Sequence, residues 1–132
     1  MKNNHNKIED IFNYIKEITG NSQDITTRII KIKNKRVGYI FLQSVSSDDK
    51  ISNFLVRSLT LDYQFDTTNL FTKLFDSLQN SISNSNLKII KKDDELFYYL
   101  SSGFTIILTD DSEQYIAVET RLKIDREKSF RW

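Results

Sequence analysis

The segment Val37 to Leu42 limits the possible folds of this chain more than any other part of the sequence. Apolar residues or glycine occupy both alternating sets of positions, with Val37, Tyr39 and Phe41 in one set and Gly38, Ile40 and Leu42 in the other. A β-strand with this pattern is typical of the middle of a sheet that helices cover on both sides. A tight turn at Asn34-Lys35 joins it to a strand that begins at Arg28. We therefore expect this hairpin to lie in the core of the domain.

Apolar residues at helical spacing predict four helices. The first carries Ile8, Ile11, Phe12, Ile15 and Ile18 and ends at Gly20, with Asn6 and Glu9 as its N-terminal capping pair. The second begins at Ser46 or Ser47 and continues to Leu59, and the third runs from Thr67 or Thr68 to Ile82. The fourth is a short helix within residues 91–103 that buries Leu96, Phe97 and Leu100.

The remaining strands are Leu87 to Ile90, Phe104 to Asp110 and Gln114 to Thr120, the last two joined by Asp111-Ser112-Glu113. The alternation of helices with strands predicts an α/β fold with a mixed β-sheet of about 4–5 strands and helices packed on both faces. Residues 1–132 are expected to form one domain, with residues 1–6 and 122–132 flexible. The order of the strands stays open at this stage.

The composition excludes several classes of protein. Nineteen basic and 18 acidic residues give a formal charge of +1, which provides no strong field for nucleic acid. The absence of cysteine excludes disulfides and thiolate metal sites. No run of about 18 apolar residues and no signal peptide occurs, so we expect the given segment to be soluble.

The inventory of reactive side chains argues against an enzyme. The single histidine, His5, lies in the polar N-terminal tail, and the three glycines form no phosphate-binding loop. Asp62 and Asp66 lie in a segment without a nearby acid, base or metal ligand, and are expected to be solvated. We expect no catalytic residue, no metal and no cofactor.

Two surface features leave alternatives open. Lys31, Lys33, Lys35 and Arg36 fit a solvated edge strand, or less readily a patch for an acidic partner or for phosphate. A ligand site between the sheet and a helix is suggested by a supply of tyrosines, but no binding residue can be singled out. These tyrosines are Tyr39, Tyr63, Tyr98, Tyr99 and Tyr115.

Several short motifs occur in an order that points to a known family. They are Gly20-Asn21-Ser22-x-Asp24 with Arg28 four residues later, the segment Ser46 to Leu59, Leu100-Ser101-Ser102-Gly103 before an apolar strand, and Thr120-Arg121. Together they resemble the amino-terminal region of the A subunit of GerA-type spore germinant receptors, over residues 8–126. Two departures occur: Asp111-Ser112-Glu113 replaces a glycine-bearing turn, and the family's Arg-x-x-x-Glu-Pro continuation is not evident after Arg126.

The resemblance implies a non-enzymatic receptor component, the first subdomain of the soluble amino-terminal domain and a fragment of a larger membrane protein. Its implied role is germinant signal transduction and receptor assembly, with binding of a small-molecule nutrient as the alternative. The implied partners are B and C subunits and other A subunits, with membrane contact only through segments not present here. The implied location is the spore inner membrane, with this domain on the spore-core side.

Eight residues of this chain match the family motifs: Gly20, Asn21, Ser22, Asp24, Arg28, Gly103, Thr120 and Arg121. Asparagine, serine and aspartate commonly form turns and caps, so we favour a structural role over contact with a ligand. In this interpretation Asp24 and Arg28 pair locally and fix the connection from the first helix to the first strand.

Overall fold

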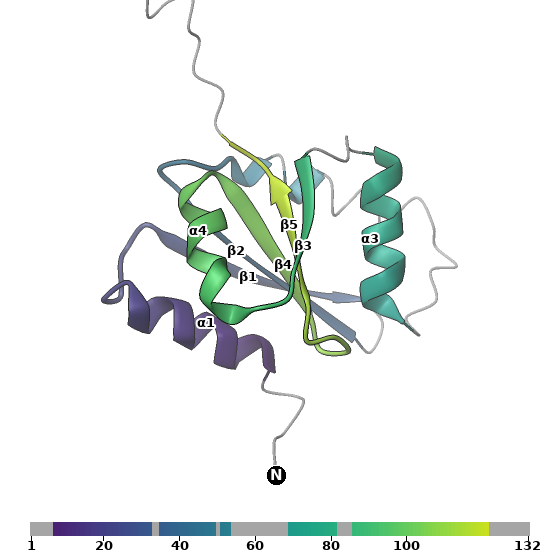
Figure 1. Cartoon of the computed structure of the whole chain (residues 1–132), viewed down its shortest axis with the longest axis horizontal. Helices are drawn as coiled ribbons and strands as arrows, with labels where there is room; N and C mark the ends of the chain where they lie inside the picture. Colours follow the sequence, from purple (N-terminus) through teal and green to yellow (C-terminus); the bar gives the residue numbers. More distant parts are fainter. Residues whose placement is uncertain (1–6, 33–34, 50, 54–68, 82–85, 122–132) are drawn as a thin grey trace, which may run out of the picture.

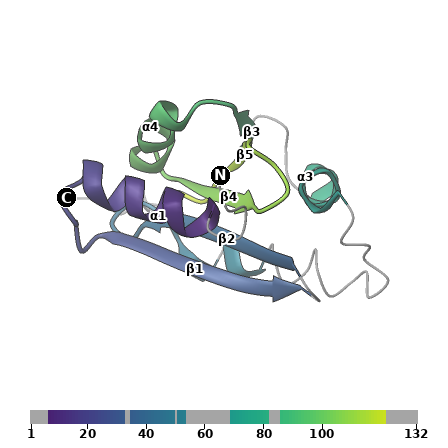
Figure 2. The same cartoon turned by 90° about the horizontal axis from the view of Figure 1, so that it is seen from below.

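Five strands form one sheet in the computed structural model, which describes residues 7–32, 35–49, 51–53, 69–81 and 86–121. The strands are β1 (Ile25–Ile32), β2 (Lys35–Leu42), β3 (Leu87–Ile90), β4 (Phe104–Thr109) and β5 (Tyr115–Glu119). Their order across the sheet is β1-β2-β4-β5-β3, so β4 is the middle strand and β1 and β3 are the edges. Figure 2 shows β1 running beside β2 along one edge.

The helices are α1 (Lys7–Ile18), α3 (Leu70–Ser81) and α4 (Leu96–Ser101), with a 3₁₀ turn η3 (Asp93–Glu95) leading into α4. Residues 48–49 and 51–53 are also helical. Helices α1 and α4 lie on one side of the sheet and α3 lies on the other (Figure 1). The predicted α/β class and the covering of both faces are therefore confirmed.

The sheet differs from the expectation in the direction of its strands. All four neighbouring pairs among the described strands are antiparallel, whereas a mixture of parallel and antiparallel pairs was expected. The reason lies in the position of β5. The connection through α4 brings β3 and β4 into the same direction, as in a βαβ unit, but β5 inserts between them and is antiparallel to both.

The alternation within β2 divides its side chains between two cores, as predicted. Ile40 and Leu42 pack in the core beneath α1 and α4, while Val37, Tyr39 and Phe41 pack with α3. The α3 side also contains Ile51, Leu70, Phe71, Leu74, Leu78, Leu87, Ile107, Ile116 and Val118. Apolar burial on both faces of one sheet is the main stabilising contribution in a domain of this construction.

Gly38 sets how closely α1 approaches the sheet. A Cβ atom at Gly38 would lie 2.6 Å from Cγ2 of Ile8 and 3.0 Å from the ring of Phe12. Both side chains belong to the buried stripe of α1, which also contains Ile11 and Ile15. The glycine therefore allows the helix to rest directly on β2.

Helix α1 ends at Gly20, as predicted, in a Schellman motif. Gly20 and Asn21 have φ angles of 67° and 60°, in the left-handed region. The N–H of Asn21 donates to the carbonyl of Lys16 (2.7 Å), and the N–H of Gly20 donates to that of Glu17 (3.1 Å). These bonds satisfy carbonyl groups that the helix leaves free.

Several predicted details differ from the structure. Ile18 and Phe97, both expected in the core, are 50% and 40% exposed. The register pairs Ile32 with Lys35, so Lys35 belongs to β2 and not to the turn in which it was expected. Residues 33–34 lie outside the described ranges. So do the tails 1–6 and 122–132, the segment 54–68 with Asp62, Tyr63 and Asp66, and Ile82.

Candidate functional site

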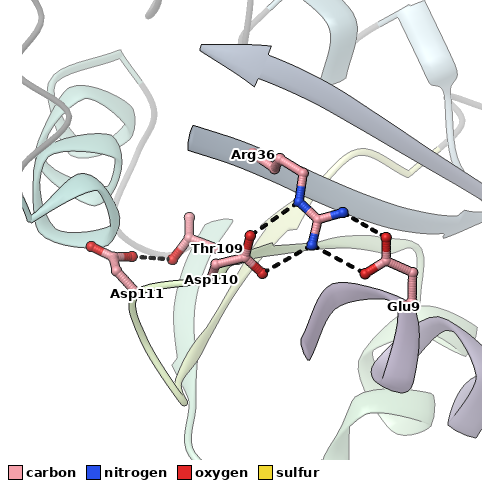
Figure 3. Close-up of polar contacts among 5 residues, drawn as sticks. All are labelled: Glu9, Arg36, Thr109, Asp110 and Asp111. Atoms are coloured by element: carbon pink, nitrogen blue, oxygen red, sulfur yellow. Dashed lines mark hydrogen bonds and ion pairs between the residues drawn. The ribbon is translucent and has the colours of Figure 1, made fainter. Parts of the chain in front are cut away.

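The turn between β4 and β5 is attached to α1 through Arg36 of β2. Nε of Arg36 donates to Asp110 Oδ2 (3.1 Å), and its terminal nitrogens donate to the two carboxylate oxygens of Glu9 (2.5 and 3.1 Å). Figure 3 shows the guanidinium lying between the two carboxylates. The bonds from Arg36 hold the pKa of Glu9 below its ordinary value, and both carboxylates raise the pKa of Arg36.

This contact bears on two expectations. Both carboxylate oxygens of Glu9 accept from Arg36. Asn6, the expected capping partner of Glu9, lies outside the described residues, so the capping pair stays a prediction. Arg36 was also grouped with lysines in a basic cluster, and its guanidinium is engaged by two carboxylates. Lys31 is exposed on the edge strand β1, as the solvated-edge interpretation expects, whereas Arg36 lies in β2, which is not an edge strand.

The same turn is attached to α3 on the opposite face through Asp111. One oxygen of Asp111 accepts from Oγ1 of Thr109 (2.5 Å), and the other accepts from the backbone N–H of Phe71 (3.3 Å). Phe71 is the second residue of α3, so a residue 40 positions away in the sequence caps this helix. A carboxylate at a helix N-terminus is also favoured by the helix dipole.

A cavity of about 550 Å³ lies beside this turn. Its walls come from the first turns of α1, the β4–β5 turn, the start of β5 and the segment that leads from β3 into η3. The cavity is lined by Lys7, Asp10, Ile11, Lys91, Asp93, Asp110, Asp111, Ser112, Glu113 and Tyr115. Charged side chains of both signs thus surround a volume within the usual range of small-molecule sites.

Tyr115 and Lys7 are the buried polar groups of this cavity. The phenol of Tyr115 donates to Asp93 Oδ1 (2.5 Å), and burial together with this acceptor raises the pKa of Tyr115. Nζ of Lys7 lies 5.7 Å from the centre of the Tyr115 ring and has no hydrogen-bond partner among the described residues. Burial lowers the pKa of Lys7, while Glu113 and nearby aspartates act in the opposite direction.

The residues matched to the family motifs lie at the other end of the sheet, and none of them lines the cavity. Asp24 accepts hydrogen bonds from the N–H and Oγ of Ser44 (2.8 and 2.5 Å). Arg28 faces Asp48 at 3.7 Å. The expected local pair of Asp24 and Arg28 is therefore not formed, because four residues of extended chain separate their Cα atoms by roughly 13 Å.

The three motif residues nearest the C-terminus, Gly103, Thr120 and Arg121, form one cluster. The N–H of Thr120 donates to the carbonyl of Gly103 (3.0 Å), and its hydroxyl shares a buried hydrogen bond with Thr105 (2.6 Å). Nε and Nη2 of Arg121 donate to the carbonyl of Ser102 (3.1 and 2.8 Å). Gly103 has a φ of 95°, and a Cβ there would lie 3.0 Å from the side chain of Arg121.

Residues 43–48, which follow β2, contact both groups of motif residues: the first group at positions 20–28 and the second at positions 103–121. Ser44 and Asp48 bond to the first group, whereas the N–H of Ser47 donates to the carbonyl of Thr120 (2.8 Å) and Ser46 pairs with Arg121. Sequence reasoning treated these residues only as the start of a helix. It also missed the cavity, although the charged run Asp110-Asp111-Ser112-Glu113 in a short turn was a usable signal.

Other kinds of site are not found in the described part of the chain. It contains no group of three or more histidine, cysteine, aspartate or glutamate side chains placed to hold a metal ion. None of its helices is long and apolar enough to cross a membrane. Of the tyrosines considered as ligand contacts, Tyr115 is the one that lines the cavity, and Tyr63 lies outside the described ranges.

The fold and the site define an antiparallel α/β domain with helices on both faces and a charged cavity at one end of the sheet. The sequence model of the Bacillus/Clostridium GerA spore germination protein family matches residues 13–129. The chain therefore belongs to the GerA family, as its motifs indicated.

The fold is similar to a solved structure, the N-terminal domain of the A subunit of the Bacillus megaterium spore germinant receptor GerK3. The TM-score is 0.70 at 23% sequence identity, over 85% of this chain and 45% of that one. The chain thus spans less than half the length of this structural relative. No curated protein matches the sequence.

Proposed function

We propose that this chain is part of the amino-terminal domain of a spore germinant receptor A subunit and contributes to receptor assembly and germinant signal transduction. Membership of the GerA family over residues 13–129 is the observation that carries the proposal. The fold shared with the GerK3 domain supports it. The proposed role is non-catalytic, and the eight motif residues act in it by holding the connections of the domain in place.

The arrangement of contacts suggests how a domain of this kind transmits a change in position. The β4–β5 turn bonds to α1 on one face and to α3 on the other, so displacement of either helix acts on the same turn. A rigid element that contacts two layers couples them mechanically. In the proposed receptor, one layer contacts other subunits and the second responds to them.

The proposed partners are B and C subunits and further A subunits. The proposed location is the spore inner membrane, with this domain on the spore-core side.

The coding sequence beyond residue 132 provides the first test, since the proposal expects several membrane-spanning helices there. A stop codon with no hydrophobic segment would argue strongly against it. The second test is co-precipitation of B and C subunits with the full-length chain from spores, compared with a chain that lacks residues 7–121.

A second candidate function is binding of a small-molecule nutrient between the sheet and a helix. The cavity beside α1 favours it, because its volume and mixed charges suit a small polar ligand. A melting-shift screen of the 132-residue protein with nutrients of different charge tests it directly. A set of polar nutrients that leaves the melting temperature unchanged would leave only the structural role.

A further inference from the structure

Strand β1 forms a long and regular edge of the sheet. It has eight residues, all paired with β2 in one continuous register, and no described strand lies on its outer side (Figure 2). Alternate residues of an edge strand direct their N–H and C=O groups away from the sheet. The opposite edge, β3, has four residues. Of the two edges, β1 therefore presents the longer row of backbone groups to a further strand.

The middle of β1 carries two exposed cations with two isoleucines between them. Arg28 and Lys31 are exposed, Ile29 is 42% exposed and Ile30 is half-buried. The contact of Arg28 with Asp48 is 3.7 Å long, and Lys31 has no hydrogen bond or ion pair with the described residues. The strand itself contains no acidic residue. Its outer edge is therefore both basic and partly apolar.

The register with β2 places the two cations on opposite faces of the sheet. Arg28 lies opposite Tyr39, whose ring packs with α3, so Arg28 lies on the α3 side. Side chains alternate along a strand, so Ile30 is also on that side, while Ile29 and Lys31 are on the α1 side. Each face of the edge thus carries one cation and one isoleucine.

These groups distinguish between the kinds of strand that could be added. A second copy of β1 would bring its own Arg28 and Lys31 close to the same two cations, and like charges on neighbouring strands are unfavourable. An apolar strand would cover Ile29 but would also take water from the cations without supplying an acceptor. A strand with a carboxylate for each cation and apolar residues between them satisfies all these side chains. Charge complementarity therefore favours an acidic partner.

We propose that the outer edge of β1 binds an extended acidic segment of a partner protein, which adds to the sheet as a further strand. The segment carries two acidic residues separated by two apolar residues, because Arg28 and Lys31 are separated by two isoleucines. This pattern reads the same in both directions, so it suits a parallel or an antiparallel strand. The inference rests on the first proposed function, receptor assembly, and specifies one surface and the chemistry of its partner.

The test uses NMR of the backbone amides of the 132-residue protein. The probe is the capped peptide Thr-Val-Thr-Glu-Val-Val-Glu-Thr-Val-Thr, and the control peptide has lysine in place of both glutamates. We expect the acidic peptide to shift the amides of Thr27 to Lys31 and to bind at least about tenfold more tightly than the control. Proline in place of either central valine removes a backbone N–H. Since one of two neighbouring N–H groups points towards β1, at least one of the two proline peptides should bind more weakly.

Charge-reversal variants connect binding to the two cations. Arg28→Glu and Lys31→Glu are each expected to weaken binding of the acidic peptide at least about tenfold, and to improve binding of the lysine peptide. Lys88→Glu is the matched control, because Lys88 is an exposed lysine of β3, the opposite edge strand. It should bind both peptides like the wild type. The melting temperature shows whether each variant remains folded.

Equal binding of the acidic and lysine peptides, shifts confined to β3, or no binding of the acidic peptide would each overturn the proposal. If the amides of β1 shift with protein concentration alone, the edge pairs with a second copy and the acidic partner is wrong. The first proposed function would survive these results, because the downstream coding sequence and co-precipitation from spores test it separately. Conversely, peptide binding combined with failed co-precipitation would keep the edge site and reject receptor assembly.

Discussion

Asp110 and Asp111 are neighbours in the β4–β5 turn, yet their carboxylates bond to elements on opposite faces of the sheet. Asp110 accepts from Arg36, which also holds Glu9 of α1, and Asp111 accepts from the N–H of Phe71 in α3. Adjacent residues in a turn can point in opposite directions, so one short connection fixes both layers of helices. The turn also forms part of the cavity wall, which joins the packing of the domain to its candidate site.

Asp111→Ala is expected to lower the free energy of unfolding by about 1–2 kcal/mol. The substitution removes the cap of α3 and leaves the buried hydroxyl of Thr109 without its acceptor. Urea denaturation measures the change. Asp111→Asn is the matched control, since its amide oxygen can still accept one hydrogen bond, and its loss of unfolding free energy should be smaller. Equal stability of Asp111→Ala and the wild type would contradict the capping role.

Gly38→Ala is expected to lower the free energy of unfolding by about 1–3 kcal/mol, because the added methyl group overlaps Cγ2 of Ile8. Thermal and urea denaturation give the value. The same change in an Ile8→Ala background tests the cause, since the clashing atom is then absent. If the loss is as large in that background as in the wild type, the contact between Gly38 and α1 is not the reason.

The contact between Glu9 and Arg36 predicts a dependence of stability on pH. Since Arg36 depresses the pKa of Glu9 in the folded state, the contribution is present above the ordinary value of 4.5 and is lost as the pH falls below it through the folded value. The contribution is modest, because the side chain of Glu9 is 44% exposed. Unfolding measured between neutral pH and the acid range should show it.

Two variants control the pH experiment. In Glu9→Gln the part of the acid destabilisation that comes from this residue should disappear. In Arg36→Gln an NMR titration should show the pKa of Glu9 returning towards its ordinary value. A pKa of Glu9 that is the same in wild type and Arg36→Gln would contradict the assigned cause.

Asp24→Ala is expected to lower the free energy of unfolding by about 0.5–1.5 kcal/mol, because Asp24 accepts two hydrogen bonds from Ser44. Arg28→Ala, in contrast, should change it by less than about 0.5 kcal/mol, since its contact with Asp48 is 3.7 Å long and both side chains are about half exposed. Thermal denaturation compares them. Full stability of Asp24→Ala would show that this residue does not fix the connection into β1.

Some features of this domain were readable from short stretches of sequence. The alternation in β2 predicted two packed faces, and the spacing of Ile8, Ile11, Phe12 and Ile15 predicted the buried stripe of α1. Gly20 marked the end of that helix because the left-handed conformation there favours glycine. Each of these signals depends on the geometry of one helix or strand.

The candidate site was not readable in this way. Arg36 is 27 residues from Glu9 and 74 from Asp110, and nothing in the sequence near any of them indicates the others. Asp24 and Arg28 illustrate the opposite error: they are close in sequence, but an extended chain keeps them apart and each bonds to residues 43–48 instead. The pairing of charged side chains depends on which strands become neighbours.

The sequence by itself determined the class of the fold, the main helices and strands and the membership of the GerA family, because periodicity and ordered motifs are properties of the chain. The tertiary structure decided the strand order, the insertion of β5 between β3 and β4, the double attachment of the β4–β5 turn and the charged cavity. These features arise from contacts between residues far apart in the sequence. The physical reason is that local preferences act within a few residues, whereas strand pairing and burial depend on the packing of the whole domain.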